Sequence, residues 1–142
     1  MKKYHLVILK KPYLEAILAG RKKLESRFSS AKRPPFGQVK VGDKLFLKKS
    51  SGPVCATATV AQVKNFENLC RHKILRLKHQ YNDLICGSEE YWQSKAHCAF
   101  GILLWLEDIR EIEPVRIAKS DWRAWVVLKE GKDFGLLRES AR

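Results

Sequence analysis

Residues 9–28 read LKKPYLEAILAGRKKLESRF and contain the junction between a predicted helix and a predicted strand. Pro12 suits the first turn of a helix, because a helix needs no N–H from its first residue. Apolar side chains recur on one stripe through residues 13–19, and Gly20 ends the helix. A strand is predicted at residues 24–28. Five of residues 21–27 are charged, so the junction is far more polar than the elements it joins.

These five charged residues form either a solvated face or a polar pocket. Alternate side chains of a strand point to opposite faces. One face would carry Lys23, Glu25 and Arg27, and the other Lys22, Leu24 and Ser26, unless the Gly20 turn twists Lys22 round to the first set. Arg27 suits a carboxylate or phosphate, because its planar fork makes two hydrogen bonds at once. We expect Glu25 to orient Arg27 or to accept from a base amino group, with an ordinary ion pair as the alternative.

Strands are predicted on both sides of this stretch. Residues 4–9 are apolar with β-branched side chains, which indicates a mostly buried strand. Residues 29–37 contain two prolines and a glycine and therefore form a surface loop. A strand at residues 44–48 and a turn at residues 50–53 follow. Small and apolar side chains then alternate with others through residues 54–63, which is typical of a half-buried strand in a curved sheet.

The period of the apolar residues changes at Asn65, where it becomes helical and continues to about Ile85. Ser88 is a candidate cap for a second, short helix. Residues 97–112 form the most strand-like run of the chain, buried on both faces and ended by Pro114. Residues 122–128 are the last predicted strand. This order predicts an α+β fold in one domain, residues 1–142, most simply a mainly antiparallel barrel with helices packed around it.

The charge of the chain is its strongest global property. It has 28 Lys and Arg against 15 Asp and Glu, a net charge of +13. Such an excess repels itself in a compact domain, which indicates a polyanionic partner, with nucleic acid the commonest case. The loop cations are expected to contact phosphates, and they are Lys32, Arg33, Lys48 and Lys49.

The start of the first helix is a second candidate phosphate site. Lys11 cannot accept a hydrogen bond, so the first N–H groups of the helix have no side-chain cap, and they lie beside Lys10 and Lys11. Water is the alternative partner for these groups. Tyr13 follows directly, and its ring is the best candidate to stack on an unpaired base.

Cysteine spacing and hydropathy limit the other classes of function. The four cysteines are 15, 16 and 12 residues apart, without the close pairs of a zinc site, so we predict no metal or cofactor and mostly buried, reduced thiols. No apolar run has the length of a signal peptide core or a membrane helix. We therefore expect an intracellular protein, either cytoplasmic or nuclear or nucleoid-associated, that does not bind membranes.

The opening stretch resembles the signature of the ASCH family, named for activating signal cointegrator homology. The matching pattern is G-x-K-x-x-E-x-R, with Gly20, Lys22, Glu25 and Arg27, preceded by Pro12 and Tyr13. The later segments VGDKLFL, FGILLWL and WVVL occur where family members have strands, so the resemblance covers most of the chain. It implies a PUA-like β-barrel, a fold associated with RNA recognition and with the reading of modified nucleotides.

The resemblance also implies possible activities. Some ASCH members look like nucleases, and a compact subset hydrolyses acetylcytidine with a lysine, a threonine and a glutamate. This chain has Glu25 at the position of that threonine, and Lys23 where the subset usually has a second threonine. The pattern favours binding of RNA, another single-stranded nucleic acid or a modified nucleotide. The alternatives are a hydrolase with Lys22 as base or nucleophile and Glu25 as its partner, and an interaction module for an acidic protein.

Overall fold

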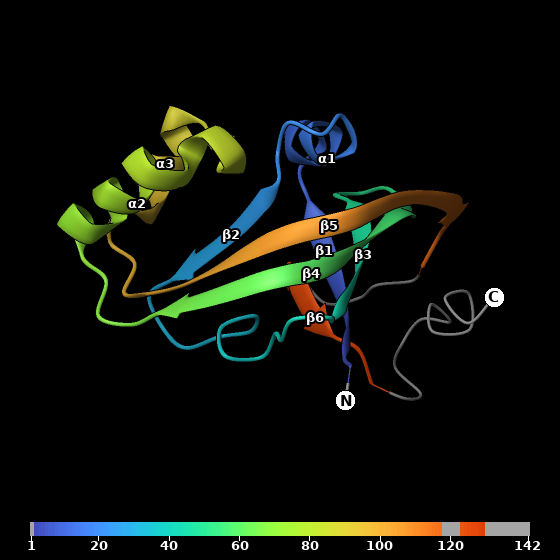
Figure 1. Ribbon diagram of the computed structural model, residues 1–142, viewed down its shortest axis with the longest axis horizontal. Helices are drawn as coiled ribbons and strands as arrows, with labels where there is room; N and C mark the ends of the chain where they lie inside the picture. Colours follow the sequence, from blue (N-terminus) through green and yellow to red (C-terminus); the bar gives the residue numbers. More distant parts are fainter. Residues whose placement is uncertain (1, 118–122, 130–142) are drawn as a thin grey trace.

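The computed structural model describes residues 2–117 and 123–129. These residues form six strands and three helices, which Figure 1 shows in order along the chain. The elements are β1 (Tyr4–Leu9), α1 (Lys11–Leu18), β2 (Leu24–Ser29), β3 (Lys44–Lys49), β4 (Val54–Phe66), α2 (Arg71–Ile85), α3 (Glu89–Lys95), β5 (Phe100–Val115) and β6 (Trp125–Val127).

The strands form one curled sheet in the order β2-β5-β4-β3-β1-β6. Every neighbouring pair is antiparallel except β1 and β3, which are parallel. The expected α+β fold and mainly antiparallel sheet are therefore confirmed. The sheet curls into a half-barrel, and among the described strands β2 and β6 form its two edges (Figure 1).

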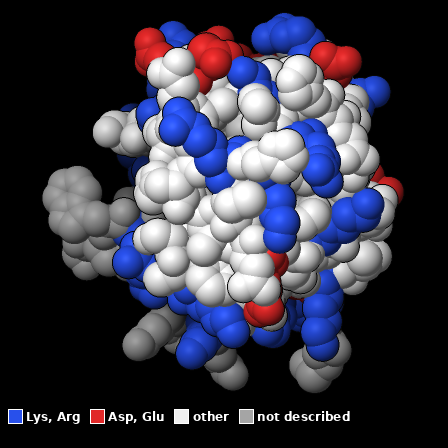
Figure 2. Space-filling model, turned by 90° about the vertical axis from the view of Figure 1, so that its left-hand side faces the viewer, with Lys and Arg blue, Asp and Glu red and all other residues white. Residues whose placement is uncertain are grey.

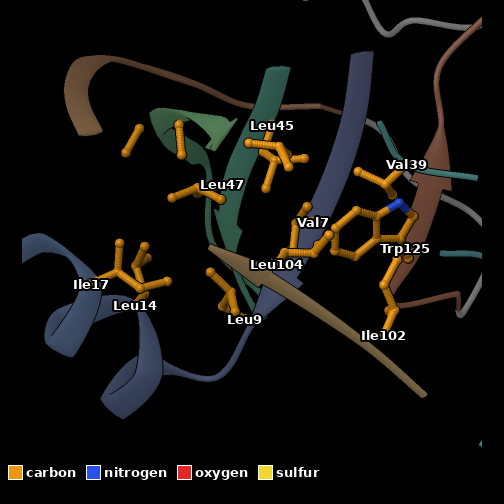
Figure 3. Packing of buried hydrophobic residues seen from close by; sticks show 13 residues of the cluster. Val7, Leu9, Leu14, Ile17, Val39, Leu45, Leu47, Ile102, Leu104 and Trp125 are labelled. Carbon is orange, nitrogen blue, oxygen red and sulfur yellow. The ribbon is translucent and has the colours of Figure 1, made fainter. Parts of the chain in front are cut away.

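The concave face of the sheet contains the inner core, which α1 covers at one end. The predicted alternation in β4 is confirmed, since Ala56 and Ala58 face inward and are fully buried, and their small side chains leave room for α1. Figure 3 shows Leu14 and Ile17 of α1 at one end of this cluster and Trp125 of β6 at the other. The inner core consists of Val7, Leu9, Leu14, Ile17, Val39, Leu45, Leu47, Ala56, Ala58, Val60, Ile102, Leu104 and Trp125.

The convex face of β2 and β5 packs against α2 and α3 and forms the outer core. Apolar residues at helical spacing on α2 meet alternate residues of the two strands there. Ser88 caps α3 as predicted, because its side chain accepts from the N–H of Tyr91. The outer core consists of Leu24, Phe28, Leu69, Ile74, Leu77, Ile85, Trp92, Cys98 and Leu103. Strand β2 therefore lies between two cores.

Several predicted boundaries were wrong. Helix α2 begins at Arg71 and not at Asn65, because β4 continues its pairing with β5 as far as Phe66. Strand β5 is buried on both faces only near its start, and it includes Pro114, which lies at an exposed position where a missing N–H costs little. The last strand is shorter than predicted, and Trp122 lies outside the described residues.

The remaining global expectations concern thiols and membranes. All four cysteines are free, as predicted, but only Cys98 is buried, and Cys70 is exposed. No helix in residues 2–117 and 123–129 has the length and apolar character needed to span a bilayer.

A buried polar network ties β6 to the rest of the sheet. His5 of β1 is fully buried, and its Nε2 lies 2.9 Å from Oδ2 of Asp43. Trp125 donates its indole N–H to Nδ1 of His5 at 3.1 Å. Since an indole nitrogen only donates, Nδ1 must be the acceptor, and the proton of neutral His5 lies on Nε2 and points to Asp43. Burial outweighs the nearby carboxylate and lowers the pKa of His5.

This network predicts a loss of stability in mild acid. Because the folded-state pKa of His5 is lowered, unfolding takes up a proton, and stability is lost as the pH falls below the ordinary histidine value of 6.5. We expect the melting temperature to drop between about pH 7.5 and about pH 5.5. The variant His5→Gln, which does not titrate in this range but retains the three other histidines, should show a flatter profile. Parallel profiles for the two proteins would contradict this role of His5.

Candidate functional site

The turn after α1 determines the direction of the Lys22 side chain. Gly20 has φ +81°, a left-handed conformation that favours glycine. The N–H groups of Arg21 and Lys22 both donate to the carbonyl oxygen of Ala16, each at 3.0 Å, so the chain folds back against α1. The N–H of Lys23 then donates to the carbonyl oxygen of Leu84 at 2.9 Å. The turn therefore lies between α1 and the end of α2.

This turn brings Lys22 to the same side as Glu25. Strand alternation alone would have placed Lys22 on the opposite face, and the sequence had left open whether the Gly20 turn would change this. The Nζ of Lys22 lies 3.6 Å from Oε1 of Glu25. The residue as a whole is only 3% exposed. It donates to the carbonyl oxygens of Leu24, at 2.9 Å, and Ile85, at 2.7 Å. The ring of Tyr13 lies 5.4 Å from the ammonium group. Lys22 is therefore a buried, fully engaged cation.

The contact with Ile85 also completes the end of α2. The last four carbonyl groups of a helix have no intrahelical partner. Ile85 is the last residue of α2, and the following residue, Cys86, adopts a left-handed conformation with φ 59°. The ammonium group of Lys22 supplies both a donor and a positive charge where the helix dipole is negative.

Glu25 is a buried carboxylate with one oxygen that lacks a hydrogen-bond donor. Oε1 accepts from the N–H of Ser26 at 2.9 Å. Oε2 lies 3.5 Å from the guanidinium of Arg27, yet it makes no hydrogen bond within the described residues. Burial by itself raises the pKa of Glu25, but the charges of Lys22 and Arg27 outweigh it and hold that pKa below its usual range. The group is therefore an ionised acceptor with unused capacity.

Arg27 connects the two edges of the half-barrel. From β2 it donates to the carbonyl oxygen of Ile8 in β1 at 3.0 Å. Its guanidinium carbon lies 5.5 Å from the ring centroid of Trp125 in β6. The side chain remains 21% exposed, so it is the part of the ion pair that a ligand can reach. Lys22, Glu25 and Arg27, with Tyr13, form what we call the polar site.

Two further residues of the polar site were not predicted. Tyr91 of α3 bonds Oγ of Ser26 at 2.7 Å and donates to its carbonyl oxygen at 3.2 Å, and burial raises the pKa of this phenol. Its ring meets Tyr13 edge to face at 6.0 Å. Trp125, a member of the inner core, also lies against Arg27. Sequence carries no signal that a core indole also contacts an arginine from the opposite edge of the sheet.

The predicted cations at the start of α1 stay at the surface. Lys10 and Lys11 are exposed, and Lys11 lies 3.8 Å from Glu15. The helix start has fewer N–H groups to offer than predicted, because Pro12 has none and the N–H groups of Tyr13 and Leu14 both donate to the carbonyl oxygen of Lys10. Any attraction for phosphate at this position comes mainly from the two ammonium groups.

The other predicted cations lie on separate surfaces. Lys23 and Arg33 are exposed, and Lys32 lies 3.5 Å from Glu67. Lys48 was predicted as a loop cation, but it belongs to β3, is 8% exposed and donates to the carbonyl oxygen of Lys49. The strand predicted at residues 44–48 already included Lys48, and β3 extends one residue further, to Lys49, which is exposed. Within residues 2–117 and 123–129, no three His, Cys, Asp or Glu side chains could share a metal ion.

The chain is similar to known proteins in its sequence family and in its fold. The ASCH domain family model matches residues 7–130. A crystal structure of ASCH from Zymomonas mobilis superposes with a TM-score of 0.72 at 14% identity, covering 96% of this chain and 94% of that chain. A tyrosine-to-phenylalanine mutant of the Zymomonas mobilis protein gives 0.73 at 15% identity, with 96% and 98% covered. At such identities the likeness concerns the fold. No curated protein matches the sequence.

The buried contacts of Lys22 predict a stability effect that an exposed cation would not have. The variant Lys22→Ala leaves Glu25 and two carbonyl groups buried without their donor, so we expect a loss of about 3 to 5 kcal/mol in the free energy of unfolding. Lys23→Ala removes the same charge from an exposed neighbour and should change it by less than about 0.5 kcal/mol. Urea denaturation of both variants measures the difference. Equal stabilities would mean that Lys22 is not the buried donor described above.

Proposed function

The chain belongs to the ASCH domain family, which is generally associated with RNA binding, and on this premise we propose that it binds single-stranded nucleic acid, RNA in the first place, at the polar site. The proposal includes a nucleotide-like ligand, because a single base is sufficient to occupy the site. The basic surface, with a net charge of +13 for the chain, would attract the phosphates.

The unsatisfied oxygen of Glu25 is the observation that carries this proposal. This oxygen is buried and lies 3.5 Å from the guanidinium of Arg27, so a ligand N–H would reach it when Arg27 turns aside, and the new hydrogen bond would recover the free energy of the missing one. An exocyclic amino group of a nucleobase is such a donor. The lowered pKa of Glu25 keeps the carboxylate ionised at neutral pH, so it can only accept.

Arg27 and Tyr13 complete the proposed contacts with the base. The exposed part of Arg27 can turn toward a base carbonyl or a phosphate, both of which suit a guanidinium. Tyr13 is half-buried and its ring meets Tyr91 edge to face, and this partial exposure supports a role in stacking on an unpaired base. Glu25 and Arg27 would then contact the edge of one base, and the ring of Tyr13 would contact the face of the same base.

The surrounding lysines and arginines are proposed to contact phosphates. Lys49 lies beside the start of α1, since it pairs with Leu9 in the β1–β3 register, and this places it near Lys10. Contacts of this kind add affinity without selecting a sequence. The exposed cations proposed for this role are Lys10, Lys11, Lys23, Lys32, Arg33 and Lys49.

A hydrolase at the same site gains no support from the geometry. As a base or nucleophile, Lys22 would have to turn a lone pair toward the substrate. Instead, its Nζ donates to two backbone carbonyl groups and faces Glu25. Catalysis by Lys22 would therefore require the end of α2 and the start of β2 to lose their shared donor.

Base preference tests the role of Glu25. If Oε2 accepts from an amino group, oligo(A) or oligo(C) should bind more tightly than oligo(U) of the same length and charge, since uracil has no amino group. One such hydrogen bond to a charged acceptor corresponds to about 1.5 to 3 kcal/mol. Fluorescence anisotropy titrations at one salt concentration measure the difference. Equal affinity for all three oligonucleotides would rule out base reading by Glu25.

Salt dependence tests the phosphate contacts near α1. The double variant Lys10→Gln and Lys49→Gln removes two proposed phosphate contacts, so the slope of log affinity against log salt should become shallower by about 1.4, or 0.7 for each contact. Lys40→Gln changes an exposed lysine at the opposite end of β3 and serves as the control. A slope unchanged in the double variant would mean that the nucleic acid does not contact Lys10 and Lys49.

A further inference from the structure

The convex side of the sheet carries a second group of aromatic and cationic side chains, away from the polar site. The rings of Tyr81 in α2 and Trp105 in β5 meet edge to face, with centroids 5.6 Å apart. Lys64 of β4 lies over both rings, with its Nζ 5.9 Å and 5.7 Å from the two centroids. We call these three residues the outer aromatic surface.

The outer aromatic surface is partly open and positively charged. Lys64 is exposed, both rings are half-buried, and within the described residues Lys64 forms no ion pair. Its Nζ and the side-chain amide of Gln80 both donate to the hydroxyl of Tyr81, at 3.3 Å and 3.1 Å. These are contacts with neutral groups, so an anion can compete for Lys64 without separating it from a carboxylate.

Further cations are exposed on the same side of the molecule, on α2 and just before β2. Lys73 and Arg76 belong to α2, and Lys73 lies one heptad before Gln80 and therefore on the same side of the helix as Gln80. The backbone carbonyl oxygen of Lys23, just before β2, accepts from the N–H of Leu106, the residue after Trp105. All three are exposed. Figure 2 shows the face that carries α2 and α3, where Lys and Arg side chains extend across the middle and acidic side chains gather mainly at the upper rim.

The two sites lie on opposite faces of the same pair of strands. Glu25 pairs with Leu104 of the inner core, whereas Leu24 pairs with Trp105 on the convex side. Strand β2 is an edge of the sheet. Only a nucleic-acid strand of several nucleotides could touch both faces, because a mononucleotide is too short to do so.

We propose that the outer aromatic surface is a second contact for the single-stranded nucleic acid that binds at the polar site. In the complex, Lys64 swings from the rings to a phosphate, and an unpaired base takes its place against Trp105. Stacking on an indole with a neighbouring cation is the usual way in which proteins hold single strands without selecting a base. This inference rests on the proposed function and adds the path of the strand.

Tryptophan fluorescence distinguishes the two sites, because each has its own indole. Trp105 reports on the outer aromatic surface, and Trp125, which contacts Arg27, reports on the polar site. Emission of the parent protein and of Trp105→Phe and Trp125→Phe is followed during titration with an oligo(A) of about 12 nucleotides, a length within the range of single-strand sites. AMP serves as the short ligand, and circular dichroism verifies that both variants are folded.

We expect the oligonucleotide to quench both indoles and AMP to quench only Trp125. Lys64→Gln should make the salt slope for the oligonucleotide shallower by about 0.7, the value of one phosphate contact, while Lys40→Gln should not change it. The inference is overturned if the oligonucleotide quenches Trp105→Phe as much as the parent and if the salt slope of Lys64→Gln is unchanged. These results would leave the proposed binding at the polar site standing.

Two other results would also overturn the inference. If the parent binds no oligonucleotide at all, both the proposed function and the second contact at the outer aromatic surface fail. If, in addition, polyglutamate binds to the parent and its affinity falls severalfold in Lys64→Gln, the surface serves an acidic protein instead.

Discussion

The buried ammonium group of Lys22 is the constraint on which the rest of this structure depends. It joins the free edge of β2, the last carbonyl group of α2 and the carboxylate of Glu25 through contacts of 2.7 to 3.6 Å. A buried charge is costly unless it is paired and hydrogen-bonded, so each of these elements must stay in place for the others to be tolerated. The outer core and the polar site are thus held by one cation.

A second constraint is the incomplete closure of the sheet. Strands β2 and β6 lie at opposite ends of the strand order, so no backbone ladder joins them within the described residues. Arg27 spans this opening to Ile8 and Trp125, and the His5–Asp43 pair holds Trp125 in turn. Polar side chains thereby perform the closure that hydrogen-bonded strands perform in a complete barrel. A ligand at the polar site would bind at this closure.

Sequence reasoning was most successful where local pattern and tertiary environment agree. The alternation in residues 54–63 and the Pro12-to-Gly20 helix were predicted closely, because burial on one face leaves a periodic signal. It failed at Asn65 and Phe66, where helix-like spacing was overridden by pairing with β5. It also failed at Lys48, because no local feature indicates that the end of a strand will be covered.

For the polar site, the sequence by itself determined the residue types and their spacing: a glycine that can end a helix, followed by a lysine, a glutamate and an arginine. Alternation along the strand was sufficient to place Glu25 and Arg27 on one face. Only the tertiary structure decided that Lys22 joins them, that Tyr91 and Trp125 surround them and that one oxygen of Glu25 is left without a donor. The physical reason is that these features depend on a left-handed turn at Gly20 and on contacts with α2, α3 and β6, which lie tens of residues away in the chain, whereas sequence patterns report only on neighbours within a few residues.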